Sequence, residues 1–136
     1  MQTYTYVSKG KFELMEKPKP VLMHERDAIV KVTLASICSS DLHIKHGSVP
    51  RAVPGITVGH EMVGVVEEVG SAVTNLTFKT GGVDGCDCKE TLRLIAEGKI
   101  DTEPLITHTY PLSKIAEAYD LFENKKDGVI KVAVEC

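Results

Sequence analysis

A cysteine and a histidine that suit a metal ion lie 22 residues apart in the first half of the chain. Cys38 ends a stretch of β-branched residues, and His60 stands in Gly59-His60-Glu61-Met62-Val63-Gly64. A thiolate and an imidazole are ligands that tetrahedral zinc prefers, and a catalytic zinc keeps one position for water or substrate. These residue types therefore predict a metal site that needs one more protein ligand.

Glu61 follows His60 directly and has two possible roles. It could supply a carboxylate as the third ligand. It could instead support His60 from outside the ligand shell, because neighbouring residues of a strand point to opposite faces. The sequence alone leaves both roles open.

Strand-like patterns dominate the part of the chain that must position these residues. Alternating and β-branched stretches predict strands at residues 3–8, 11–16, 28–37, 61–69 and 129–134. Capping side chains and apolar residues at helical spacing predict helices at residues 39–46, 88–97 and 113–124. The first helix would begin directly after Cys38, so the thiol lies at its N-terminus.

Composition excludes several classes of protein. The chain has 136 residues, of which 43% are hydrophobic and 26% charged, as in a globular domain. The net charge of −3 comes without a basic stripe, and no apolar run approaches the roughly 20 residues that cross a bilayer. We expect a cytoplasmic protein without a nucleic acid or membrane partner, whose four cysteines are free thiols.

The motif around His60 resembles the signature of zinc-dependent medium-chain alcohol dehydrogenases. That signature has fixed positions that the sequence matches at Gly59, His60, Glu61, Gly64, Gly70 and Val73. Residues 37–43 are similar to the cysteine-containing turn of the family, with Ser39 where glycine is usual. Residues 91–134 resemble the end of the same enzymes, so the resemblance covers nearly the whole chain.

The resemblance implies a mainly β fold with short helices, an α+β chain that forms a partly open GroES-like barrel. It implies a single GroES-like catalytic domain over residues 1–136, made of 1–79 and 91–136 and joined at 80–90. In the family a Rossmann domain lies between the two segments, and many members also carry a structural-zinc lobe. We expect the Rossmann domain to be missing, because the sequence holds no Gly-x-Gly-x-x-Gly motif. We expect the lobe to be missing too, because the sequence lacks four closely spaced cysteines.

The resemblance also implies roles for individual residues. Cys38, His60 and Glu61 would be the metal ligands and zinc the cofactor. Zinc would act as a Lewis acid that lowers the pKa of a bound alcohol. Ser40 would take the alcohol proton and His43 would relay it to solvent. In the full-length family NAD(P) accepts the hydride from a small alcohol, giving an aldehyde or ketone.

Two functions follow for this chain. One is the zinc-binding catalytic domain of an alcohol dehydrogenase-like oxidoreductase. We expect it to have weak or no turnover, because the cofactor domain is missing. Whether the chain is an enzyme is therefore left open by the sequence. The alternative is a non-catalytic GroES-like binding or structural module, natural or engineered. We expect the face left by the missing domain to be apolar and able to self-associate.

The remaining cysteines carry a weaker signal. Cys86 and Cys88 could lend zinc a replacement ligand or could be junction residues without a function. Cys136 is expected to take no part in the site.

Overall fold

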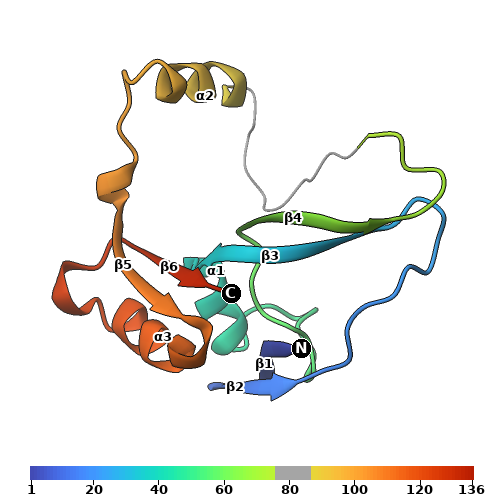
Figure 1. The fold of residues 1–136 in the computed structure, drawn as a ribbon. Coiled ribbons are helices and arrows are strands. Elements are labelled where there is room, and N and C mark those ends of the chain that lie inside the picture. The colour runs from blue at the N-terminus through green and yellow to red at the C-terminus, as the bar shows by residue number, and fades with distance from the viewer. Residues whose placement is uncertain (76–86) are drawn as a thin grey trace.

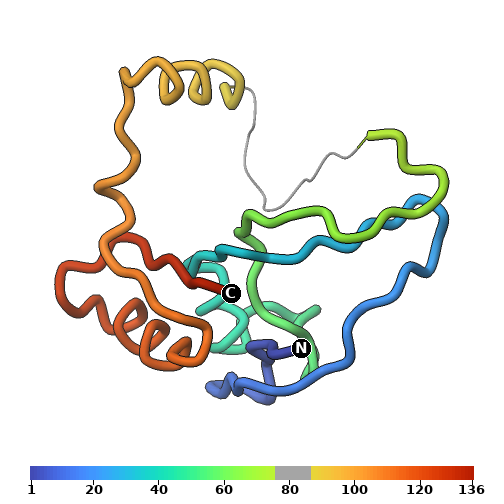
Figure 2. Tube along the Cα trace, viewed as in Figure 1, coloured from blue at the N-terminus to red at the C-terminus, as the bar shows by residue number. Residues whose placement is uncertain are grey.

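Six strands and three α-helices form the chain in a computed structural model, which describes residues 1–75 and 87–136 (Figures 1 and 2). The strands are β1 (Gln2–Ser8), β2 (Lys11–Glu16), β3 (Ala28–Ser36), β4 (Met62–Val69), β5 (Ile106–Pro111) and β6 (Lys131–Glu135). The helices are α1 (Ser39–Lys45), α2 (Cys88–Ala96) and α3 (Ile115–Glu123). Short 3-10 turns span Glu103–Leu105, Leu112–Lys114 and Lys126–Gly128. Most of the junction expected at 80–90, Cys86 included, lies outside the described residues.

The strands divide into a hairpin and a mixed sheet. β1 pairs antiparallel with β2. The other four strands are ordered β4-β3-β6-β5, with β3 antiparallel to both of its neighbours and β5 parallel to β6. Leu34 of β3 lies opposite Glu135 of β6, so the last strand joins the sheet beside one from the first third of the chain. This pairing closes the chain around the region of Cys38.

Backbone hydrogen bonds hold the loop in front of β4 against β1. The Gly55 amide donates to the Tyr6 carbonyl at 2.8 Å, and the Tyr6 amide donates to the Ile56 carbonyl at 3.0 Å. The Val58 amide donates to the Tyr4 carbonyl at 2.8 Å. The loop is therefore fixed up to two residues before His60.

The hydrophobic core lies where α3 packs on β1, β2 and β6. Ile115, Ala118 and Tyr119 form the buried face of α3, at the spacing of one helical face. The core residues are Tyr4, Ile37, Ile115, Ala118, Tyr119, Val132 and Val134. The rings of Tyr4 and Phe12 lie 5.0 and 5.5 Å from the ring of Tyr119. The core therefore unites the first 40 residues of the chain with the last 25.

The predicted fold class is confirmed as mixed α and β, with short helices and open sheets. Each predicted strand and helix is present with ends shifted by two residues or fewer. One strand, β5, was not predicted. Its run from Ile106 to Tyr110 is β-branched and aromatic and is bounded by Pro104 and Pro111, a pattern that is typical of a strand.

Parts of the structure expose apolar side chains. On β4, Val63 and Val65 are 61% and 64% exposed. Helix α2 stands apart from the sheets and has no buried residue, and its Leu92 is exposed (Figure 1). Within residues 1–75 and 87–136, no helix is both long and apolar enough to cross a membrane.

Candidate metal centre

Cys38 lies at the point where β3 gives way to α1. It is the residue that caps the N-terminus of α1, in an extended conformation. Its neighbour Ile37 is 1% exposed, and the Ile37 amide donates to the Val132 carbonyl of β6 at 3.1 Å. The buried side chain and this hydrogen bond fix where the thiol of Cys38 can lie.

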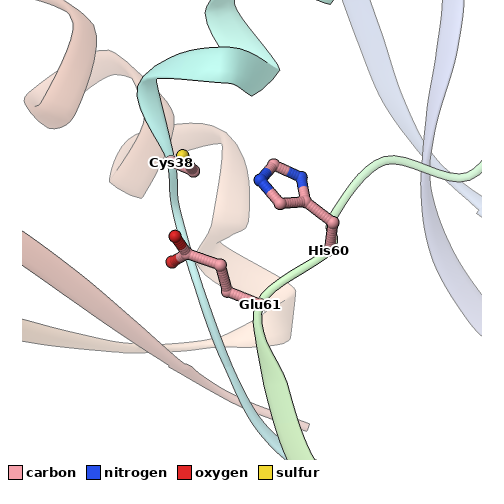
Figure 3. Close-up of side chains that lie close together, drawn as sticks. All are labelled: Cys38, His60 and Glu61. Carbon is pink, nitrogen blue, oxygen red and sulfur yellow. The ribbon is translucent and has the colours of Figure 1, made fainter. Parts of the chain in front are cut away.

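His60 and Glu61 both turn toward Cys38 from the loop before β4 (Figure 3). Ligand atoms of the three residues lie within 4.8 Å of one another. Gly59 has a φ of +118°, a left-handed conformation that turns the chain just before His60. Since β4 begins only at Met62, the alternation of a strand does not apply to His60 and Glu61, and both side chains reach the same space.

The hydroxyl of Ser40 lies between the thiol and the imidazole. Its Oγ donates to Sγ of Cys38 at 3.2 Å and lies 2.9 Å from Nε2 of His60. A hydroxyl can donate one proton and accept others, so Ser40 can exchange a proton with a group bound between these two residues. The geometry therefore brings Ser40 into the cluster with the three ligand candidates.

Asp41 supports the cluster from the interior of the protein. It is completely buried, and its Oδ2 accepts a hydrogen bond from the Cys38 amide at 3.1 Å. Its Oδ1 lies 3.3 Å from Nδ1 of His60. A carboxylate beside one ring nitrogen directs the other ring nitrogen toward a metal. The capping position of Asp41, three residues after Cys38, is the sequence signal for this contact.

Glu61 carries two hydrogen bonds that the sequence did not predict. Lys131 of β6 and Ser36 of β3 both donate to its Oε2. Partial burial would by itself raise the pKa of Glu61, but the hydrogen bonds from Lys131 and Ser36 and the positive charge of Lys131 hold it below its usual value. Glu61 is therefore an anion beside the thiol and the imidazole.

The sulfur, nitrogen and oxygen donors of Cys38, His60 and Glu61 are of the types that zinc binds. A tetrahedral zinc with bonds of about 2.0 to 2.3 Å keeps its ligand atoms about 3.5 Å apart. Atoms already within 4.8 Å reach that spacing through small side-chain movements. Asp41 also gives His60 the carboxylate partner that metal-binding histidines commonly have. Within the part of the chain that the structure describes, Cys88 and Cys136 lie outside this cluster.

His43 is not brought into the cluster. It lies on α1 one turn after Ser40, and its side chain is exposed. Among the described residues its ring makes no hydrogen bond. The structure thus assembles four of the five candidate site residues and leaves His43 on the surface of the same helix.

A cavity of about 940 Å³ opens beside the cluster. His60 and Glu61 line it together with apolar side chains that include Val30, Val32 and Leu112. Small-molecule sites in proteins have about 300–1,000 Å³ and combine apolar walls with a few polar groups. The cavity has the size of such a site, and two of the three candidate ligands, His60 and Glu61, lie at its wall.

Comparisons with known proteins point to one family. The profile of the family described as "Alcohol dehydrogenase GroES-like domain" matches residues 24–105. An alcohol dehydrogenase of Cupriavidus necator is 46% identical over 88 residues, which are 65% of this chain and 24% of that protein. An uncharacterized zinc-type alcohol dehydrogenase-like protein, AdhB of Bacillus subtilis, is 42% identical over 76 residues, 56% of this chain and 20% of that protein.

Solved structures of alcohol dehydrogenases are also similar to this chain. The apo form of zinc-dependent alcohol dehydrogenase 2 from Streptococcus pneumonia is 44% identical, with a TM-score of 0.54 over 60% of this chain and 23% of that one. The alcohol dehydrogenase TADH from Thermus sp. ATN1 is 43% identical, with a TM-score of 0.52 over 57% of this chain and 22% of that one. The chain spans about a quarter of the length of these relatives.

Proposed function

We infer the function from the family, because the chain belongs to the alcohol dehydrogenase GroES-like domains. We propose that Cys38, His60 and Glu61 bind a zinc ion and that the chain is the zinc-binding catalytic domain of an alcohol dehydrogenase-like oxidoreductase. The observation that carries the proposal is the convergence of a thiol, an imidazole and a carboxylate within 4.8 Å. These are the ligand types that zinc takes in enzymes.

The residues around the three ligands have separate tasks in this proposal. When bound, zinc supplies a Lewis acid that lowers the pKa of an alcohol. Asp41 keeps Nδ1 of His60 turned inward. The Ser40 hydroxyl, beside both Cys38 and His60, takes the proton of the alcohol at Oγ. His43, exposed one turn further along α1, passes that proton to water.

Hydride transfer needs a partner group outside this cluster. We propose NAD(P) as the acceptor and a small alcohol, aldehyde or ketone as the substrate, held in the cavity beside His60. The sequence contains no Gly-x-Gly-x-x-Gly motif to hold a dinucleotide. We therefore propose that this chain alone turns over weakly or not at all.

We also propose that residues 1–79 and 91–136 form one domain. The pairing of β6 with β3 supports this, because it joins the two segments through a shared sheet. A second candidate function, a GroES-like module without redox activity, is favoured by the exposed apolar residues of β4 and α2. Such surfaces are typical of sites that bind another protein or a second copy.

The test is a zinc titration of the purified chain and of Cys38→Ser, with Cys136→Ser as the matched control. We expect about one zinc per chain in the wild type and the control and none in Cys38→Ser. Unchanged zinc content in Cys38→Ser would sink the proposed site. Titration with NAD(P)H, followed by fluorescence, separates the two functions, because saturable binding with alcohol-dependent reduction would show an active dehydrogenase.

A further inference from the structure

The cavity beside the candidate metal centre has an exposed part and a protected part that differ in polarity. The exposed part of the lining, its mouth, holds most of the charged side chains, namely Lys19, Lys31, Glu67 and Glu68. In the protected part, the buried and half-buried lining residues are hydrophobic except for Thr3, His60 and Glu61. The cavity is therefore apolar wherever it is withdrawn from solvent, with a few polar groups at fixed places.

The apolar wall of the cavity comes from three separate regions of the chain. Val30 and Val32 contribute from β3, Leu112 and Ile115 from the turn that leads into α3, and Val134 from β6. Ile115 and Val134 also belong to the hydrophobic core, and Leu112 packs against it. The core therefore supports this wall from behind.

The three polar groups of the protected part are not equally available to a ligand. The Thr3 hydroxyl donates to the Met15 carbonyl at 3.2 Å and lies 3.1 Å from Oγ1 of Thr5, so it is satisfied within the protein. His60 and Glu61 are the other two, and both are candidate zinc ligands. A ligand in the protected part can therefore place its own polar group only beside His60 and Glu61.

The charged side chains at the mouth of the cavity balance one another. Lys19 and Glu67 lie 3.9 Å apart from nitrogen to oxygen, and Lys31 and Glu68 add one charge of each sign. Such a mouth has no surplus of positive charge to attract a carboxylate and no surplus of negative charge to attract an amine. The charges favour a neutral ligand.

The size of the cavity favours a ligand larger than the shortest alcohols. Its volume is about 940 Å³. Pockets of about 300–1,000 Å³ hold drug-sized ligands, so ethanol would leave most of this space to water. Water against an apolar wall lacks hydrogen-bond partners there, and replacing it with an apolar group increases affinity. Each carbon added to the ligand should therefore strengthen binding until the wall is covered.

Among the alcohols that the proposed function admits, we propose that the cavity selects neutral alcohols with an extended apolar chain. Their hydroxyl lies beside His60 and Glu61, and their chain covers Val30, Val32 and Leu112. This inference rests on the proposed function, because it names the class of alcohol that the same site takes. The contacts between the chain and the wall involve no metal, so they can be measured without zinc.

The test is a series of alcohols, butanol, hexanol and octanol, titrated into the metal-free chain in the presence of EDTA. The methyl groups of valine and leucine are followed by ¹³C NMR. We expect the Kd to fall about fourfold for each added methylene, with the largest shifts at Val30, Val32 and Leu112. A Kd that does not depend on chain length, or largest shifts at the exposed Val63 and Val65 of β4, would overturn the inference.

Octanoate tests the preference for a neutral ligand. It has the same chain length as octanol but carries a carboxylate. We expect octanoate to bind about tenfold more weakly than octanol, because its carboxylate would lose water without gaining a cationic partner. Octanoate that binds as tightly as octanol, or more tightly, would overturn the choice of an alcohol.

A pair of variants tests the position of the chain in the cavity. Val32→Phe adds ring atoms to the apolar wall, and Val65→Phe adds the same atoms at an exposed position of β4 that does not line the cavity. We expect Val32→Phe to weaken octanol binding about tenfold, as the loss of room for one or two methylenes requires, and to change butanol binding little. Val65→Phe should change neither. Wild-type selectivity in Val32→Phe would contradict the proposed position, and if this variant does not fold, the alcohol series in the wild type decides.

The proposed function and this inference can fail separately. A chain that binds no zinc but still prefers longer alcohols at Val30, Val32 and Leu112 would refute the zinc site and support the inference. A chain that binds zinc but has the same Kd for butanol and octanol would keep the proposed function and overturn the inference.

Discussion

Lys131 donates a hydrogen bond to Glu61 across 70 residues of sequence. Lys131 is the first residue of β6, and Glu61 immediately precedes β4, so the contact ties the end of the chain to the candidate metal centre. Ser36 donates to the same oxygen, Oε2. Oε1 of Glu61 thus remains for a further partner, and the charge on Glu61 depends on a residue far from it in the sequence.

Replacing Lys131 by methionine should raise the pKa of Glu61. Partial burial of Glu61 favours its neutral form, and Lys131 now outweighs that effect. A carboxyl of lowered pKa stabilises the fold above its ordinary pKa and loses this contribution as the pH falls through the folded value. In Lys131→Met, the stabilising contribution of the Glu61 carboxylate should therefore be lost at a higher pH than in the wild type. The measurement is a ¹³C NMR titration of the Glu61 carboxyl.

Lys99→Met is the matched control, since the side chain of Lys99 is 62% exposed and pairs with Glu97 instead. Its Glu61 titration should coincide with that of the wild type. An unshifted midpoint in Lys131→Met would contradict the role given to the ion pair.

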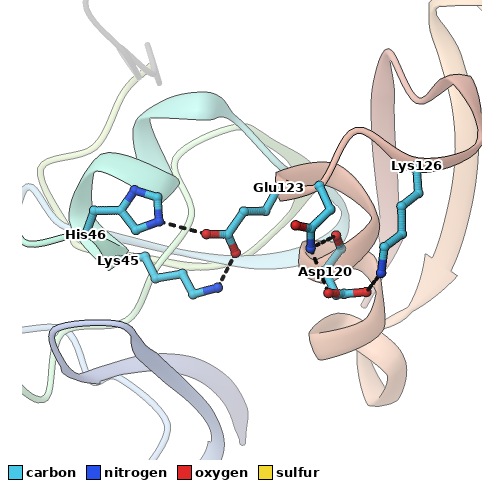
Figure 4. Close-up of polar contacts among 6 residues, drawn as sticks. Lys45, His46, Asp120, Glu123 and Lys126 are labelled. Atoms are coloured by element: carbon cyan, nitrogen blue, oxygen red, sulfur yellow. Dashed lines mark hydrogen bonds and ion pairs between the residues drawn. The ribbon is translucent and has the colours of Figure 1, made fainter.

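Glu123→Gln should weaken the contact between α1 and α3. It should also make the free energy of unfolding depend less on pH in the acid range. The hydrogen bond from Lys45 is the largest cause of the lowered pKa of Glu123, and the hydrogen bond from His46 adds to it (Figure 4). The wild type should lose this stability as the pH falls below about 4.3. The variant should lack this stabilisation already at pH 7, so its free energy of unfolding should be about 1 kcal/mol lower than that of the wild type. Urea unfolding across this pH range measures the free energy of unfolding of the wild type and the variant. Glu117→Gln, at an exposed position of α3, is the control and should change this free energy little.

Gly64→Ala should destabilise the chain by about 1–3 kcal/mol. A Cβ at Gly64 would lie 2.3 Å from the Lys31 carbonyl oxygen and 2.9 Å from Cγ1 of Val30. The clash is with backbone, so relief requires β3 and β4 to separate where Gly64 pairs with Val32. Urea unfolding gives the free energy. A loss no larger than that of Val65→Ala, at a neighbouring exposed position, would count against this packing argument.

Zinc should stabilise the folded chain if the proposed site binds it. At a free zinc concentration 100 times the Kd, the free energy of unfolding should rise by about 2.7 kcal/mol. A chelator should reverse the gain, and Cys38→Ser should not show it. Equal stabilisation of the wild type and Cys38→Ser in thermal unfolding would place the zinc elsewhere.

Local pattern was enough to predict most elements but not their arrangement. The β-branched run of β3 and the apolar spacing of α3 determine their type directly. The parallel pairing of β5 with β6, and the place of β6 beside β3, depend on packing between distant segments. β6 starts two residues later than predicted, because the chain leaves a turn in which Asp127 has a φ of +51°.

The candidate ligands were predictable for a different reason. Residue type indicated Cys38 and His60, and the resemblance of the motif around His60 to the family signature added Glu61, whose role the sequence alone left open. Lys131 carries no such signal. It is an ordinary lysine until the fold places it beside Glu61.

The position of β6 also sets the order in which the molecule can assemble. Leu34 finds its partner Glu135 only after about a hundred intervening residues have been made. Contacts between distant segments form slowly, because the loop between them must first be closed. On a ribosome, the β1–β2 hairpin and α1 can form early, but the Cys38 region has to wait for the last strand. Until then β3 has an unpaired edge, which is the stage at which a chaperone would have most to protect.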